Sequence, residues 1–432
     1  MTLATNLAIG VLGLATGSAS ARLLGPIGRG ELSAIQTIPS FLGMLALLGV
    51  PSAVAYFSAR EPHAARSLTL TAMGLASLGA VAFMALGLML MPWALKHQSA
   101  STVHYARLYL VFVLLQAIQV APYLALQGLG RFRAWNLLRL APTISWLGTL
   151  GLGWLQGNTT AGWFSCSYLI AYAATIPVVV GTLWRSTSGP GRFATERIGP
   201  MLRYGIPSAA ATVPSSLNLR LDQMLMAALV APRLLGLYAV GVSWSNMMMP
   251  IFGALGATVF PALASTHDTG VRRQLLGRTL RLAVVTALAL GAALAVITPV
   301  AFPLVFGARF APAIAATLVL IAAGIILSIN SVLEEMLRAL GGPVWTMYAQ
   351  FVALPITLAI LGTTLIRWQL MSAAIASLVS YLAATTVMFA GTRRLSGLST
   401  AELLTPQPGD IELLRETIGL AWRRIRKTLA LA

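Results

Sequence analysis

Long, uninterrupted apolar runs are the feature that most limits what this chain can fold into. A helix that crosses a bilayer needs about 20 mostly apolar residues, and about 12 such runs follow one another along the chain. They lie near residues 3–21, 33–58, 67–95, 105–127, 137–156, 161–184, 201–229, 236–262, 280–306, 313–340, 346–366 and 369–392. Because the runs are continuous rather than alternating, they predict helices and not the strands of a β-barrel. We therefore predict an all-α integral membrane protein.

The composition excludes several other classes of protein. Hydrophobic residues make up 57% of the 432 residues and charged residues only 9%, whereas a soluble protein carries about 25% charged residues. A disordered chain, a soluble enzyme and a disulfide scaffold are therefore excluded. The net charge of +18 invites a nucleic-acid partner, but the basic residues occupy short gaps between apolar runs. Since they form no patch interleaved with aromatic residues, we expect no nucleic-acid binding.

The distribution of basic residues predicts the orientation of the chain. With a cytoplasmic N-terminus, the inside loops and the C-terminal tail hold 21 basic residues, and the outside loops, which include Arg22 and Arg29, hold 7. This bias places both termini in the cytoplasm. Ala19-Ser20-Ala21 resembles a signal-peptidase site, but no basic residue precedes Arg22. A signal peptide normally begins with a positive segment, so we expect the first run to remain as a span.

Two sets of matching residues predict that the chain contains an internal repeat. Pro26 and Gly30 match Pro232 and Gly236, both at an offset of 206 residues. A second match sets 66–68 against 278–280, at an offset of 212 residues. Six spans per half would give both halves the same orientation. A parallel repeat of that kind places the substrate path at the interface between the halves.

We therefore predict three regions along the chain. Residues 1–195 are expected to form an N-terminal six-helix bundle, 196–395 a C-terminal six-helix bundle, and 396–432 a cytoplasmic tail. From Asp410 onward, apolar residues recur on one face of a predicted helix and most arginines lie off that face. Such a basic amphipathic helix either lies on the anionic cytoplasmic leaflet or docks on the protein itself.

The sequence offers little catalytic chemistry. Neither of its lysines, Lys96 and Lys427, follows a glycine, so the chain has no phosphate-binding P-loop. Its four histidines lie in or near different loops, and its one cysteine, Cys166, allows no intrachain disulfide. The gaps between apolar runs are too short for a catalytic domain. We therefore expect no enzyme, no cofactor and no metal site.

The seventh apolar run carries the clearest polar group inside a predicted span. An ionised side chain there costs at least about 2.5–3.5 kcal/mol, so it usually faces a cavity or a partner. Helical spacing places Ser215, Asn218 and Asp222 on one face, and Arg220 points away from Asp222. We predict substrate-binding roles for Asn218, Arg220, Asp222 and Gln223. A structural ion pair with other spans is the alternative.

The tenth run ends in a second charged group. Asn330, Glu334 and Arg338 form a stripe near its predicted cytoplasmic end, and Glu335 is expected to point elsewhere. We predict ion-coupling or gating roles for Asp222, Glu334, Glu335 and Arg338, against the alternative of an interfacial salt bridge.

Uncharged polar residues inside the other runs allow two interpretations. They either line a path for a sugar or form hydrogen bonds between helices. These residues are Gln36, Gln116, Gln119, Gln127, Gln350, Asn246, Tyr123, Tyr168, Tyr172 and Tyr348.

Several short motifs resemble those of one transporter family. Ala21-Arg22-Leu23-Leu24-Gly25-Pro26, followed by Arg29-Gly30, is similar to the first loop of the bacterial polysaccharide-export, O-antigen-flippase-type branch of the multidrug/oligosaccharidyl-lipid/polysaccharide exporter superfamily. The segments 48–57, 220–223 and 235–240 also resemble this branch. The matches lie in both predicted halves, and members with 12 spans agree with the predicted number.

This resemblance implies a multi-pass protein of the bacterial inner membrane that flips undecaprenyl-diphosphate-linked oligosaccharide. The substrate would move from the cytoplasmic to the periplasmic leaflet by alternating access between two six-helix bundles. The resemblance implies membrane lipid, a polysaccharide polymerase and chain-length proteins as further partners. Arg220 would bind the diphosphate, since guanidinium groups fit phosphate oxygens.

Two other functions stay open at this point. The first is a cation-coupled drug or metabolite exporter of the same superfamily, with Asp222 and Glu335 as proton or sodium sites. The second is a membrane enzyme or scaffold of polysaccharide assembly.

Overall fold

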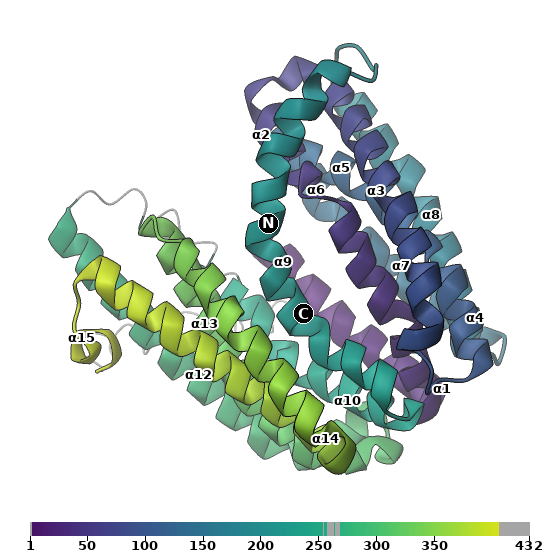
Figure 1. Ribbon diagram of the computed structural model, residues 1–432, viewed down its shortest axis with the longest axis vertical. Coiled ribbons are helices and arrows are strands. Elements are labelled where there is room, and N and C mark those ends of the chain that lie inside the picture. Colours follow the sequence, from purple (N-terminus) through teal and green to yellow (C-terminus); the bar gives the residue numbers. More distant parts are fainter. Residues whose placement is uncertain (1, 254, 257–262, 264–267, 406–432) are drawn as a thin grey trace, which may run out of the picture. The chain divides into compact units, whose positions relative to one another are not determined.

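The computed structural model describes residues 2–253, 255, 256, 263 and 268–405. Every regular element in these ranges is a helix, which confirms the predicted all-α class (Figure 1). The amphipathic helix predicted from Asp410 onward lies outside the described residues. Within the predicted tail, residues 396–405 contain only the end of α14 and one short helix. Ser399 and Glu402 form a capping box at the N-terminus of this short helix.

The helices follow one another with short connections, as the spacing of the apolar runs predicted. In chain order they are α1 (Thr2–Ala46), α2 (Val50–Arg60), η1 (Pro62–Ala64), α3 (Ala65–Ala94), α4 (Ala100–Tyr109), α5 (Val111–Gly128), α6 (Phe132–Leu138), α7 (Ala141–Leu155), α8 (Ala161–Ser186), η2 (Thr195–Arg197), α9 (Ile198–Leu229), α10 (Pro232–Ser245), η3 (Asn246–Met248), α12 (Thr269–Phe306), η4 (Ala308–Ala313), α13 (Ile314–Ala339), α14 (Val344–Ser396) and α15 (Thr400–Leu404).

Eight helical segments in the described part of the chain are long and apolar enough to cross a membrane. They are Thr5–Ala46, Pro62–Ala94, Ala100–Gly128, Ala161–Ser186, Pro232–Gly253, Thr269–Phe306, Ala308–Ala339 and Val344–Ser396. The chain is therefore a multi-pass membrane protein. The number of twelve spans and the cytoplasmic position of both termini stay predictions.

The helices α1 and α2 do not begin and end where the first two predicted spans, 3–21 and 33–58, were placed. Residues 22–32, expected as an outside loop, are helical within the element α1, in which two helices meet at a kink at Gly25 (φ 64°). Glycine allows this backbone conformation, and Pro26 after it cannot donate the usual helical hydrogen bond. The helix instead ends at Ala46, inside the predicted span 33–58, because Leu48 and Gly49 adopt left-handed conformations before α2.

The last two predicted spans are two helices that meet at a kink within the element α14. A break at Gln369 (φ 44°) divides it, at the position where sequence placed the start of the last span. A positive φ is uncommon for a residue other than glycine. Here it lets the two helices meet, and the hydroxyls of Thr364 and Ser372 on either side of the break lie 2.6 Å apart.

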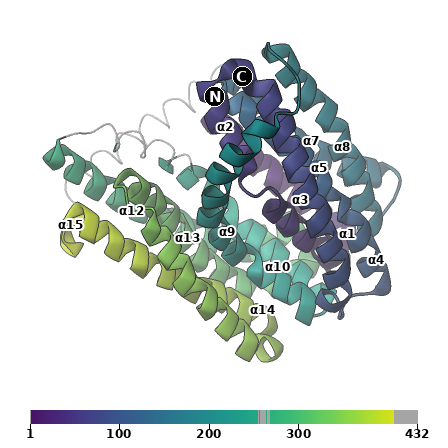
Figure 2. The same cartoon turned by 45° about the horizontal axis from the view of Figure 1, so that its top comes forward.

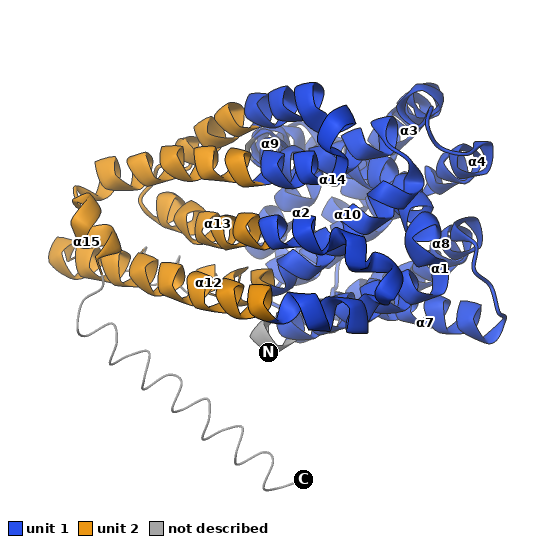
Figure 3. Cartoon of the chain, turned by 90° about the horizontal axis from the view of Figure 1, so that it is seen from below, with its two compact units in different colours: residues 1–247, 297–320, 354–377 blue, residues 248–296, 321–353, 378–432 orange. Residues whose placement is uncertain are grey.

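The chain divides into two compact units that interleave along the sequence (Figure 3). Unit 1 comprises residues Met1–Met247, Ile297–Leu320 and Leu354–Ser377, and unit 2 comprises Met248–Val296, Ile321–Ala353 and Leu378–Ala432. The helices α12, α13 and α14 therefore each contribute to both units. The division into bundles at residues 195 and 196, and a tail from 396, stays a prediction.

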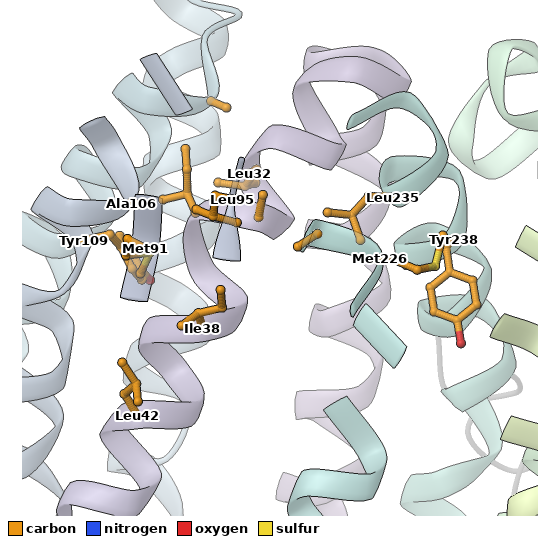
Figure 4. Close-up of a cluster of buried hydrophobic side chains, with 14 of the residues drawn as sticks. Leu32, Ile38, Leu42, Met91, Leu95, Ala106, Tyr109, Met226, Leu235 and Tyr238 are labelled. Carbon is orange, nitrogen blue, oxygen red and sulfur yellow. The ribbon is translucent and has the colours of Figure 1, made fainter. Parts of the chain in front are cut away.

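The core of unit 1 is built from small and medium-sized apolar side chains on helices that are far apart in sequence (Figure 4). Within this unit, α7 and α8 lie side by side in both ribbon views (Figures 1 and 2). Buried members of the core include Leu32, Ile38, Leu42, Met91, Leu95, Ala106, Tyr109, Met226, Leu235 and Tyr238. Close packing rather than water exclusion holds such helices together in a bilayer.

Large apolar side chains also cover the outside of the helices. Leu78, Met89 and Ile170 are exposed on α3 and α8, as expected of surfaces that face lipid. Trp93 and Trp154 are exposed near the ends of α3 and α7. Tryptophan is enriched at the interface between membrane and water, so these two residues are placed to anchor the helix ends there.

Arginines tie corresponding helix ends in the two units. In unit 1, Arg66 at the start of α3 donates to the carbonyl oxygen of Trp184 (2.6 Å), in the last turn of α8. In unit 2, Arg273 at the start of α12 donates to the carbonyl oxygens of Ser396 (2.9 Å) and Gly397 (3.0 Å) at the end of α14. A cation is favourable at a helix C-terminus because the last carbonyl groups lack helical partners.

Candidate functional site

The polar face predicted on the seventh apolar run lies on α9, within unit 1. Asn218 and Asp222, one helical turn apart, are 5% and 4% exposed, and both contact α14. The hydroxyl of Ser215, one turn earlier, is buried and has no hydrogen-bond partner in the described part of the chain. The prediction that these three residues share one face of a helix is therefore confirmed.

The carboxylate of Asp222 is held entirely by neutral donors. Its Oδ2 accepts hydrogen bonds from the hydroxyls of Tyr238 on α10 and Ser377 on α14, the second at 3.3 Å. Its Oδ1 accepts the backbone N–H of Gln223 at 2.6 Å. No cation pairs with Asp222 among the residues that the structure describes. A buried carboxylate normally requires such donors, because burial without them is costly.

Asn218 adds a second link from α9 to α14. Its Oδ1 accepts a hydrogen bond from the hydroxyl of Thr357 at 3.0 Å. Asn218 and Asp222 therefore join one face of α9 to two positions of α14, Thr357 and Ser377, one on each side of its break at Gln369.

Arg220 lies on a different face of α9 from these residues. It is exposed, as is its neighbour Leu219, and it makes no hydrogen bond or ion pair with any described residue. The prediction that Arg220 cannot pair with Asp222 is confirmed, because residues two apart on a helix point in different directions. The four residues predicted to bind substrate are thus divided, with Arg220 exposed, Asn218 and Asp222 buried, and Gln223 half-buried.

The second charged group lies on α13, within unit 2. Arg338 donates to the carboxylates of Glu334 (2.7 Å) and Glu335 (2.9 Å). The expectation that Glu335 points elsewhere is wrong, because i, i+3 spacing also brings two side chains together on a helix. Asn330 does not join this group and instead donates to the carbonyl oxygen of Tyr381 (3.1 Å) on α14.

Two arginines of α1 were assigned to an outside loop, and the structure places both within a helix. Arg22 donates from Nε to the carbonyl oxygen of Val305 (2.9 Å), near the end of α12. Arg29 donates to the hydroxyl of Ser33 (3.4 Å), and its Nε is buried without a partner among the described residues. The sequence placed both residues wrongly, because nothing in it showed that two helices of α1 meet directly at Gly25 without a loop.

Unit 1 also contains a cavity of about 300 Å³ that sequence reasoning did not assemble. Gln36, Tyr109, Trp146 and Tyr168 are among the residues that line it. Gln36 and Tyr168 were singled out as polar residues inside spans, but nothing in the sequence related them to Tyr109 or Trp146. The four side chains come from α1, α4, α7 and α8.

A second cavity in unit 1, of about 610 Å³, lies near the bend of α1. Arg22, Gly25 and Arg309 are among its lining residues. Both arginines are exposed. They carry positive charge, and no Asp or Glu is among the described residues that line the cavity, so the cavity is positively charged.

Comparison with known proteins identifies the family. Residues 20–315 match the family model described as polysaccharide biosynthesis protein. No curated protein matches the chain in sequence.

Solved structures share the fold over most of the chain. The chain is 15% identical to a multidrug resistance MATE family transporter of the MOP superfamily in its inward-facing conformation, with a TM-score of 0.73 over 91% of this chain and 98% of that one. It is 12% identical to the lipid II flippase MurJ, with a TM-score of 0.71 over 91% of this chain and 89% of that one. A MOP superfamily transporter from Pyrococcus furiosus also matches, at 14% identity and a TM-score of 0.57, over 92% of this chain and 96% of that one.

At these identities the solved structures show a common fold, while the family model covers more than half of the chain. The neighbours are transporters and flippases rather than enzymes. The chain belongs to the polysaccharide biosynthesis protein family, and it has the fold of the MOP superfamily transporters.

Proposed function

We propose that this protein flips undecaprenyl-diphosphate-linked oligosaccharide from the cytoplasmic to the periplasmic leaflet of the bacterial inner membrane. The observation that carries the proposal is the family match over residues 20–315, on a fold shared with a lipid II flippase. Alternating access would expose the substrate first to one leaflet and then to the other. The polymerase and chain-length proteins expected as partners belong to the same proposal.

The geometry of α9 supports distinct roles for its polar residues. Arg220 is exposed and has no described partner, so its guanidinium is free to bind the oxygens of a diphosphate. Asn218 and Asp222 are already bonded to Thr357, Tyr238 and Ser377. In our proposal these two buried residues, together with Gln223, hold the helix that carries Arg220, and they reach the substrate only after a conformational change.

The charged residues of the two units fit a coupling role. Asp222 has no described cationic partner, so a proton or a sodium ion can bind to its carboxylate without displacing an ion pair. Glu334, Glu335 and Arg338 form an ion-pair group whose opening can accompany a gate. We propose both as sites where an ion gradient acts on the transport cycle.

The test measures the sidedness of lipid-linked glycan in a deletion strain without a redundant flippase. A membrane-impermeant lectin is applied to intact spheroplasts and to opened vesicles. The intact gene should return glycan to the outer face, and Arg220→Ala should lower this signal about tenfold or more, since a charged hydrogen bond contributes about 1.5–3 kcal/mol. Arg220→Lys keeps the charge and should retain part of the signal.

The control is Arg233→Ala, which removes an exposed arginine at the start of α10. It should leave the lectin signal unchanged. Unchanged outer-face glycan in the deletion strain overturns the proposed function. Full activity of Arg220→Ala overturns only the role given to Arg220.

A cation-coupled drug or metabolite exporter is the second candidate. It is favoured by the buried Asp222 carboxylate without a described cationic partner and by the shared fold with a multidrug resistance transporter. In that case, Asp222→Asn should abolish efflux and drug resistance. Equal resistance with and without the gene removes this candidate.

A further inference from the structure

The cavity of about 300 Å³ in unit 1 lies among five helices, α1, α4, α5, α7 and α8. Its volume is at the lower end of the range of about 300–1,000 Å³ that is typical of small-molecule sites. The cavity is thus large enough for one small ring-shaped group and too small for a long oligosaccharide.

Aromatic rings form the walls of this cavity. Tyr109 and Phe112 stack with ring centroids 5.3 Å apart and an interplanar angle of 18°. Trp146 packs edge-on against Tyr168 at 5.2 Å. Because each ring is fixed by a ring beside it, the walls present rigid, flat apolar surfaces.

Hydrogen-bonding groups without charge complete the lining. Gln36 contributes an amide group, and Thr16, Ser40 and Thr143 contribute hydroxyl groups. None of the lining residues in the described part of the chain is Asp, Glu, Lys or Arg. The cavity therefore offers both donors and acceptors but neither a cation for a phosphate nor an anion for a cationic drug.

We propose that this cavity binds one uncharged sugar ring of the glycan carried by the substrate, an inference that rests on the proposed flippase function. A pyranose ring has faces of C–H groups, which pack on aromatic rings, and a rim of hydroxyl groups. The rim requires amide and hydroxyl partners such as Gln36 and Ser40. A diphosphate requires cations instead, and a polyprenyl chain would leave the polar lining unpaired.

The sugar ring and the diphosphate of the substrate would bind at different places in the protein. The uncharged cavity is lined by α1, α4, α5, α7 and α8, whereas Arg220 lies on α9. The sugar ring and the diphosphate are then recognised by different side chains. Sugar preference should depend on the cavity alone.

Gly13 allows the cavity to be filled without disturbing the backbone. It lines the cavity, and a Cβ atom placed there would meet no other atom within 4 Å. Gly17, one turn along α1, is equally open but is not part of the lining. Gly13→Leu should therefore reduce outer-face glycan at least tenfold in the lectin assay, and Gly17→Leu should not change it. Thermal melting checks that both variants are folded.

A second measurement detects binding without relying on transport. Trp146 is replaced by the photoreactive residue p-benzoylphenylalanine, and cells that make the lipid-linked oligosaccharide are irradiated. The expected result is glycan, detected by lectin, attached to the protein. The control is the same replacement at Trp154, which is also on α7 but is 68% exposed and does not line the cavity. Attachment at Trp146 should exceed attachment at Trp154 at least fivefold.

The outcomes separate the two proposals. If the wild-type gene does not restore outer-face glycan, the proposed function falls and the sugar site falls with it. If the wild-type protein flips, the sugar site is overturned when attachment at the two positions is equal. Full activity of a folded Gly13→Leu overturns it as well. If Gly13→Leu does not fold, the attachment experiment alone decides.

Discussion

Gly30 of α1 and Gly236 of α10 pack against each other so closely that neither position has room for a side chain. A Cβ atom at Gly30 would overlap the carbonyl oxygen of Pro232, and one at Gly236 would overlap that of Pro26. The contact is reciprocal, and the four residues are those that the sequence repeat matched at an offset of 206. Reciprocal contacts between equivalent positions are what a two-fold relationship between repeats produces.

Alanine at either glycine should destabilise the protein. Since the overlap involves backbone rather than a mobile side chain, Gly30→Ala and Gly236→Ala should each lower the free energy of unfolding by about 1–3 kcal/mol or more. Thermal melting of the purified protein in detergent measures the effect. Gly151→Ala is the control, because a Cβ atom on that face of α7 meets nothing within 4 Å, and it should melt no lower than the wild type. Equal melting of all three variants would contradict the close packing.

Removing one donor from the Asp222 carboxylate should also cost stability. Tyr238→Phe leaves Oδ2 with only the Ser377 hydroxyl, and a hydrogen bond to a charged group contributes about 1.5–3 kcal/mol. Melting should show this loss, whereas Tyr348→Phe, at an exposed tyrosine on α14, should change little. A Tyr238→Phe protein as stable as the wild type would refute the role of this donor.

Replacing the carboxylate itself tests its two-sided hydrogen bonding. Both oxygens of Asp222 accept hydrogen bonds, but an asparagine side chain has only one acceptor oxygen. In Asp222→Asn, the side-chain NH₂ group should therefore face either the backbone N–H of Gln223 or the hydroxyl of Tyr238. One hydrogen bond is lost in this way, so the melting temperature should fall. It should also lower transport in the lectin assay. Unchanged stability together with lost transport would assign Asp222 to coupling alone.

An ion pair outside the predicted spans should make stability depend on pH. Arg197 donates to both oxygens of Glu61, at 3.0 and 2.7 Å, and these hydrogen bonds hold the pKa of Glu61 below its usual value of 4.5. A carboxylate with a lowered pKa stabilises the fold above its unfolded-state pKa, and this contribution is lost as the pH falls through the folded-state pKa. Both side chains are about one-third exposed, so the contribution should be only about 0.2–1 kcal/mol.

The measurement compares melting of the wild type and Glu61→Gln between neutral and acid pH. The wild type should be more stable at neutral pH, and the two curves should converge at the acid end. Glu196→Gln makes the same charge change without removing a hydrogen bond to Arg197 and should follow the wild type more closely. Parallel curves for wild type and Glu61→Gln would contradict the prediction.

The charged group on α13 should show coupling between its two acids. Because Arg338 pairs with both, Glu334→Gln or Glu335→Gln alone leaves one partner and should cost about 0.2–1 kcal/mol. The double variant leaves Arg338 with neither acid and should cost more than the sum of the two. A double-mutant cycle of melting measurements tests this, and strict additivity would mean that the two pairs are independent.

Much of the architecture was predictable because a bilayer imposes simple demands. Every span must satisfy its own backbone hydrogen bonds and present apolar side chains to lipid, so the runs in the sequence predicted the helices directly. The face shared by Asn218 and Asp222, and the separation of Arg220 from it, followed from the 3.6-residue period alone. The match of Gly30 with Gly236 was visible as a repeat, although not as a contact.

The tertiary structure decided the contacts between helices, which the period of a single helix cannot predict. The break at Gly25 within α1, the pairing of Glu335 with Arg338, and the donors around Asp222 depend on which helices pack together. The cavity beside Gln36 and Trp146 depends on five helices. Sequence by itself determined the class of protein, its helices and their polar faces, because these depend on local period and solvent. Only packing between distant segments decided which polar residues are partnered and which line a cavity, because those contacts do not exist until the chain has folded.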